Sequence, residues 1–157
     1  MQRGSSLLEV LVATSVVVVG VVALAQLATL AARANLQARQ TTLAAVLAQA
    51  KMEELLSEAA TGLSPSPPDA LGRNVEGYSD FVDRRGTSLG GGPTPPPDSA
   101  YLRRWSIEPL PNSANNTLIL QVLVTDLRNR GAADTTTAVM RLPGEARSVG
   151  AKARKAF

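Results

Sequence analysis

A run of 23 residues without a charged side chain, Val10 to Ala32, most strongly constrains how this chain can fold. About 20 apolar residues in a helix are enough to cross the hydrocarbon core of a bilayer. Many residues of the run are valines, which are weak helix formers in water, but in lipid the backbone must hydrogen-bond internally and a helix is favoured. The run therefore predicts a membrane-spanning helix.

The helical composition continues past this run. No Pro or Gly interrupts the chain from Val21 to Thr61, and residues 33–60 consist mainly of strong helix formers. We expect one continuous helix from about Ser6 to Ala60, ended by Gly62 and the prolines that follow it. Residues 5–32 are its transmembrane half and residues 33–60 its outer half.

The outer half of this helix is expected to cover a soluble head with an apolar stripe. Lys51 and Glu54 are assigned to the more polar side of the helix. The residues that recur at helical spacing and form the predicted stripe are Leu43, Val46, Leu47 and Ala50.

The rest of the chain changes from loops to strands. Residues 61–100 are rich in Pro and Gly and predict a variable loop region, in which Phe81 and Val82 fix a short turn or helix to the head. Residues 101–143 alternate with period two and predict an antiparallel meander. Its strands are expected at 101–109, 117–127 and 135–142. Residues 144–157 are interpreted as a basic flexible tail.

These elements together predict an α+β fold. A long N-terminal helix would pack on a small antiparallel sheet of about three to four strands, because a sheet with an apolar face needs a cover. In the strand at 117–127, Ile119 and Leu123 make the second face partly apolar, which favours a central position in the sheet.

Composition argues against catalysis and against metal binding. The chain has no cysteine and no histidine, so disulfides and thiolate sites are excluded, and the commonest general base and metal ligand are absent. Asp80 and Asp83 are close enough in sequence to form a carboxylate pair, but surface loop charges are the favoured interpretation. We expect no catalytic residue, no metal and no cofactor. The formal net charge of +3 is too small to indicate nucleic acid as a partner.

The N-terminus has three competing interpretations. The first is a plain signal-anchor helix. The second is a cleaved signal peptide, for which Ala23-Leu24-Ala25 supplies a cleavage site and Gln26 a new N-terminus. Neither explains Glu9, a carboxylate in an apolar stretch, which is costly in lipid and marks a functional position.

The third interpretation is a resemblance carried by Arg3-Gly4-Ser5-Ser6-Leu7-Leu8-Glu9-Val10-Leu11-Val12-Ala13. This stretch closely resembles the class III signal of type IV prepilins and type II secretion pseudopilins. The resemblance implies that residues 1–4 are a leader, held on the cytoplasmic side by Arg3. Prepilin peptidase would cut between Gly4 and Ser5 and methylate the new amine. Ser5 departs from the Phe or Met that is most frequent at this position. Glu9 would be required for subunits to enter a filament.

The resemblance also implies a role and a location. The chain would be a minor pilin or pseudopilin, a non-enzymatic subunit of a type IV pilus or a type II secretion pseudopilus. Its partners would be prepilin peptidase, other pilin or pseudopilin subunits, the inner-membrane assembly platform and the membrane. It would cross the bacterial inner membrane once, with a periplasmic or extracellular head.

Two alternatives remain open. One is a minor pilin of a DNA-uptake system, which the basic tail supports. The other is a bitopic envelope protein whose head binds a ligand and in which Glu9 has no role.

Overall fold

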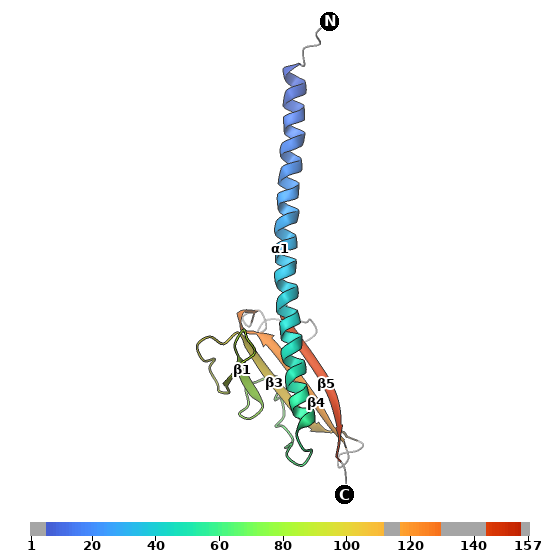
Figure 1. The fold of residues 1–157 in the computed structure, drawn as a ribbon, viewed down its shortest axis with the longest axis vertical. Helices are drawn as coiled ribbons and strands as arrows, with labels where there is room; N and C mark the ends of the chain where they lie inside the picture. Colours follow the sequence, from blue (N-terminus) through green and yellow to red (C-terminus); the bar gives the residue numbers. More distant parts are fainter. Residues whose placement is uncertain (1–5, 112–116, 130–143, 155–157) are drawn as a thin grey trace. The chain divides into compact units, whose positions relative to one another are not determined.

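The computed structural model describes residues 6–111, 117–129 and 144–154. One long helix, α1 (Leu7–Ser57), precedes a five-stranded sheet (Figure 1). The strands are β1 (Ser79–Val82), β2 (Ser88–Gly90), β3 (Tyr101–Pro109), β4 (Thr117–Asp126) and β5 (Glu145–Ala153), with a short 3-10 helix, η1 (Leu127–Asn129), after β4. The predicted α+β fold is confirmed, with more strands than the three to four expected.

Helix α1 is continuous, as predicted. Its 51 residues correspond to about 77 Å at 1.5 Å per residue. It begins one residue after the predicted start and ends three residues before the predicted end, Ala60. The Gly62 backbone N–H donates to the carbonyl of Ala59 at 2.9 Å, so the chain leaves the helix through a turn at the predicted stop.

The chain divides into two compact units, Met1–Gln37 and Ala38–Phe157. In the first unit, every described residue belongs to α1 or directly precedes it, and all of them are exposed. The second unit, which we call the head, contains the last part of α1 and the whole sheet.

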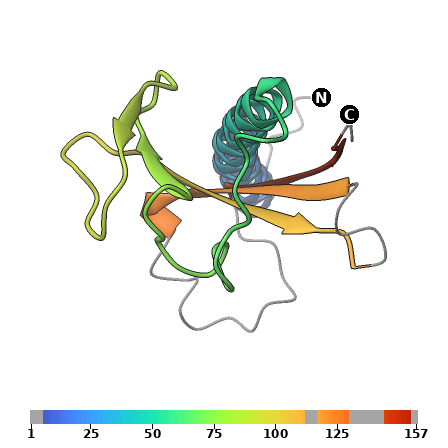
Figure 2. The ribbon, with the colours of Figure 1, turned by 90° about the horizontal axis from the view of Figure 1, so that it is seen from below.

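The sheet of the head has the order β2-β1-β3-β4-β5, and every neighbouring pair is antiparallel. Figure 2 shows the head part of α1 on one face of this sheet. Strand β4 alternates between buried and half-buried residues, which confirms its predicted central position. The four β4 side chains that face the core have no exposed surface: Leu118, Leu120, Val122 and Val124.

The buried face of α1 differs from the predicted stripe. Val46 is 57% exposed, whereas Lys51 is buried beside the core. The buried helical residues are Ala44, Leu47, Ala48, Lys51, Met52 and Leu55. The Lys51 ammonium lies 4.1 Å from the centre of the Trp105 ring on β3. Lys51, which was assigned to the more polar side of the helix, therefore faces the sheet. A lysine can bury its aliphatic stem in this way while its charge meets an aromatic face.

The opposite face of the sheet is covered by the segment that follows α1 (Figure 2). Arg104 on β3 donates hydrogen bonds to the Asn74 side chain and to the Leu71 carbonyl, which ties this segment to the sheet. Phe81 and Val82 were expected in a short turn or helix, but both lie in strand β1 and have no exposed surface. All four residues of β1 are buried, so both faces of this short strand are covered, which stabilises it.

The predicted flexible tail from residue 144 is wrong for most of its length. Residues Glu145–Ala153 form β5, which pairs with Thr117 to Thr125 of β4. The predicted strand at 135–142 lies outside the described residues. A Cβ built on Gly150 would stand 3.0 Å from the Met52 sulfur, so a residue without a side chain lets β5 pass directly beneath α1.

Lys152 on β5 caps the C-terminal end of α1. Its ammonium donates hydrogen bonds to the carbonyls of Leu55 at 3.2 Å, of Leu56 at 2.6 Å and of Glu58. The last carbonyls of a helix have no partner within the helix, and a positive charge there also interacts favourably with the helix dipole. The basic residue therefore joins the sheet to the helix.

Replacing Lys152 with methionine is expected to destabilise the head by about 1–2 kcal/mol, because three carbonyls lose a charged donor while the aliphatic stem is kept. Denaturation of the full chain in detergent, followed through Trp105, the single tryptophan, measures this change. Arg154→Met is the control, since it removes a neighbouring positive charge that makes no hydrogen bond to the helix end among the described residues. Equal losses in both variants would contradict the capping role.

Candidate processing and assembly site

Ser6 caps the N-terminal end of α1. The backbone N–H of Glu9 donates to the Ser6 carbonyl at 2.9 Å and lies 3.3 Å from the Ser6 hydroxyl oxygen. A serine hydroxyl that accepts from the third helical N–H is the usual N-cap arrangement. Helix α1 therefore starts at Leu7 for a local reason, and Glu9 occupies the third helical position.

The sequence predictions give Ser6 no capping role, although the spacing Ser6-x-x-Glu9 matches the capping-box pattern. In a complete box, the glutamate side chain returns to the backbone N–H of the serine. Here only the serine half is formed within the part of the chain that the structure describes. The Glu9 carboxylate is exposed and has no hydrogen-bond or ion-pair partner among those residues.

The predicted cleavage site is not placed by the structure. Arg3, Gly4 and Ser5 lie outside the described residues, so the cut after Gly4 and the position of the new amine stay predictions. Of the predicted site residues, Glu9 alone is described. It lies in the first turn of α1, where a negative charge interacts favourably with the helix dipole.

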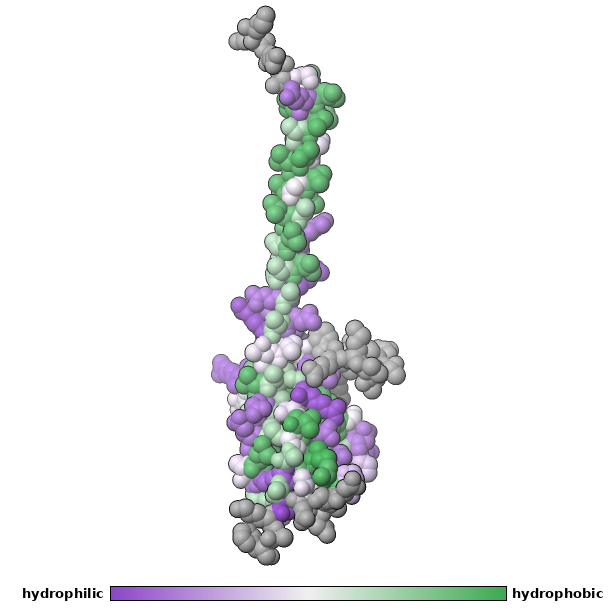
Figure 3. Space-filling model, turned by 90° about the vertical axis from the view of Figure 1, so that its right-hand side faces the viewer, coloured by the Kyte–Doolittle hydropathy of each residue, from purple (hydrophilic) through white to green (hydrophobic). Residues whose placement is uncertain are grey.

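The N-terminal part of α1 is long and apolar enough to cross a membrane, by length and composition. Its most apolar window has a mean hydropathy of 2.6 and contains no buried residue. Figure 3 shows the resulting hydrophobic surface along the helix. The hydroxyls of Thr14 and Ser15 donate to the carbonyls of Val10 and Leu11 at 2.6 and 2.8 Å, so both are satisfied without water.

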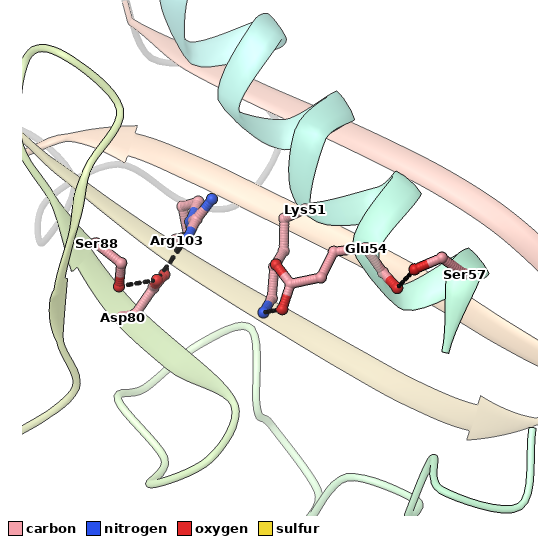
Figure 4. A network of polar contacts seen from close by, with 6 residues as sticks. All are labelled: Lys51, Glu54, Ser57, Asp80, Ser88 and Arg103. Carbon is pink, nitrogen blue, oxygen red and sulfur yellow. Dashed lines mark hydrogen bonds and ion pairs between the residues drawn. The ribbon is translucent and has the colours of Figure 1, made fainter. Parts of the chain in front are cut away.

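The two carboxylates considered for catalysis have separate roles. Asp80 accepts two hydrogen bonds from Arg103, at 2.9 and 2.5 Å, and one from Ser88 at 2.7 Å (Figure 4). It is 8% exposed, so its interpretation as a surface loop charge is wrong. Asp83 accepts from the backbone N–H groups of Arg85 and Thr87 at 2.8 Å each. The Thr87 hydrogen bond holds the pKa of Asp83 below its ordinary value.

The remaining charged contacts in the core connect α1 to the sheet. Lys51 forms an ion pair with Glu54 at 2.7 Å (Figure 4). Its ammonium also lies over the Trp105 ring. Together with the Asp80–Arg103 pair, this contact positions helix and strands. Within the described ranges, no group of three or more His, Cys, Asp or Glu residues could hold a metal ion.

Comparison of the chain with protein-family models, with curated proteins and with solved structures gives no match. Any functional assignment therefore depends on the N-terminal residue pattern and on the fold. The fold, a long apolar N-terminal helix packed on an antiparallel sheet, is compatible with a pilin-like protein.

Proposed function

We propose that this chain is a minor pilin or pseudopilin, a structural subunit of a type IV pilus or a type II secretion pseudopilus. Prepilin peptidase would cut it after Gly4, and the exposed apolar helix would carry it from the membrane into a filament. The proposal includes no catalytic activity of the chain itself.

One combination of observations carries this proposal. Gly4 and Glu9, spaced as in the signal that this N-terminus resembles, are found where a single helix of 51 residues begins. The last part of this helix packs on an antiparallel sheet. A processing signal that leaves its apolar helix attached to the mature protein needs a helix that continues into the folded head. A cleavable signal peptide needs only a short apolar segment, and does not explain why the same helix continues into the head.

The position of Glu9 supports its proposed role in assembly. After a cut at Gly4, the new amine at Ser5 would directly precede the Ser6 cap, one turn from Glu9. An unpaired carboxylate in hydrocarbon is costly, and the amine of a neighbouring subunit would neutralise it. A subunit placed in the wrong register would leave both charges unpaired, so this pair would select the correct stagger.

The cleavage prediction is tested by coexpressing the full chain with a prepilin peptidase and sequencing the mature N-terminus. We expect the product to start at Ser5, and a Gly4→Leu variant to stay uncut, because a large side chain prevents close approach to the scissile bond. A Ser5→Ala variant is the matched control and should still be cut. An intact Met1, or a start at Gln26, would contradict the proposal.

The alternative of a DNA-uptake pilin stays a prediction that the head structure does not test. Its basis was a basic tail, but Lys152 is bonded to the end of α1 and Arg147 to Gln121 within the sheet. A bitopic envelope protein with a ligand-binding head remains the other alternative. That protein would keep Met1 and would tolerate replacement of Glu9, so the same experiments separate it from a pilin.

A further inference from the structure

A polar cavity of about 530 Å³ lies at the end of the sheet where β1 and β4 finish and β3 begins. It is separate from the N-terminal site and lies wholly in the head. Its walls are the β1–β2 turn, the residues before β3 and the start of η1. The lining residues are Asp83, Arg84, Arg85, Asp98, Ser99, Ala100 and Arg128.

Backbone hydrogen bonds hold these walls together. The Ala100 N–H donates to the Val82 carbonyl at 2.9 Å, and the Leu127 N–H donates to the Ala100 carbonyl at 3.0 Å. The β1–β2 turn is closed by the Asp83 N–H, which donates to the Thr87 carbonyl at 3.0 Å. The cavity is therefore formed before any ligand binds, which lowers the cost of binding.

One guanidinium of the cavity is fixed in position. Arg128 donates from Nε and Nη2 to the Asp126 carboxylate at 3.3 and 3.2 Å, and Asp126 has no exposed surface. The Arg128 side chain is nevertheless 54% exposed. A buried carboxylate thus orients Arg128 while Nη1 keeps its donors, since neither of these two contacts uses it.

Two further guanidiniums are exposed at the turn. Arg84 and Arg85 make no side-chain hydrogen bond or ion pair with any residue the structure describes. The neighbouring Asp83 carboxylate makes no ion pair with either arginine among the described residues, and its Oδ1 accepts from the backbone N–H groups of Arg85 and Thr87. The turn therefore presents two arginines whose side-chain donors are not used by any described residue.

We propose that this cavity binds a phosphate-bearing ligand through Arg84, Arg85 and Arg128. Guanidinium groups hold phosphate oxygens with paired, charge-assisted hydrogen bonds. Three guanidiniums match the several oxygens and the double charge of a phosphate better than the two oxygens of one carboxylate. The volume leaves room for an organic group attached to the phosphate. The carboxylates of Asp83 and Asp98, also in the wall, limit the affinity by repulsion.

Calorimetric titration of inorganic phosphate into the full chain, held in a phosphate-free maltoside detergent at constant chloride, tests the proposal. We expect saturable binding that weakens at least about tenfold in the Arg84→Ala/Arg85→Ala double variant. Asp98→Asn should strengthen binding several-fold, because a repulsive charge is lost. Arg73→Ala is the matched control, since it removes an exposed arginine outside the cavity and should leave the affinity unchanged.

Addition of phosphatidylglycerol to the micelles identifies the source of the phosphate. If phosphatidylglycerol competes with inorganic phosphate, the natural ligand is a lipid headgroup. If it does not compete, the ligand is soluble. Either result supports the site. Lack of saturable binding by the wild type, or equal affinity of the double variant and the wild type, would overturn the proposal. A loss in Arg73→Ala as large as that in the double variant would also overturn it. Unchanged Trp105 fluorescence confirms that each variant is folded.

Discussion

The Glu9→Gln variant is expected to be cut after Gly4 like the wild type, but to enter filaments about a hundredfold less well. Glutamine has nearly the shape of glutamate and still accepts hydrogen bonds, but it carries no charge. The amine of the neighbouring subunit would then lie in the membrane without a counter-charge, at a cost of about 3 kcal/mol. Quantifying the filament fraction against the processed membrane fraction measures the effect.

The helix cap provides the control for this experiment, because Glu9 also matches the last position of a capping box. Glutamine serves a capping box as well as glutamate does, so Glu9→Gln spares the cap and removes the charge. Ser6→Ala does the opposite: it costs about 1 kcal/mol of helix stability and keeps the charge. Normal assembly of Glu9→Gln combined with poor assembly of Ser6→Ala would show that Glu9 acts only through the helix end.

The Asp80→Ala variant is expected to destabilise the head by about 3–5 kcal/mol. The variant strands the Arg103 guanidinium, whose side chain is 9% exposed, between β1 and the head part of α1. A buried charge that loses its counter-charge costs far more than the ion pair itself contributes. Denaturant unfolding of the full chain in detergent, followed through Trp105 fluorescence, measures the loss.

Two further variants separate this effect from a general loss of charge. The Asp80→Leu/Arg103→Met double variant removes both charges and keeps similar volumes, so it should recover most of the lost stability. Glu54→Ala breaks the ion pair with Lys51. Because the Glu54 side chain is 61% exposed, this variant should lower the stability of the head by less than about 1 kcal/mol. A double variant as unstable as Asp80→Ala would contradict the stranded-charge explanation.

Helix α1 and strand β4 were predictable because local patterns determine them. The absence of Pro and Gly between Val21 and Thr61 favours one helix whatever the tertiary structure is. In β4, the apolar residues at every second position from Leu118 to Val124 predict one buried face, and the half-buried Ile119 and Leu123 confirm that the other is partly covered. Both patterns act between residues that are close together in the chain.

Lys51 and β5 were not predictable by the same means. Helical spacing shows that one face of α1 is buried, but the Trp105 ring on β3 decides that Lys51 belongs to it. Strand β5 consists mostly of small and polar residues, so it carries no apolar alternation. It is a strand because nine consecutive residues find partners along β4, and the paired residues are 20 to 36 positions apart in the chain.

By itself, the sequence determined that this protein has a membrane-compatible N-terminal helix and a sheet behind it, since hydrophobic runs and periodicities are properties of neighbouring residues. It also carries the Gly4–Glu9 pattern on which the proposed processing depends. Only the tertiary structure decided which charges are buried, that Lys152 closes the end of α1, and that three arginines from two separate segments line one cavity. Those outcomes depend on pairing between distant segments, which spacing along the chain does not encode.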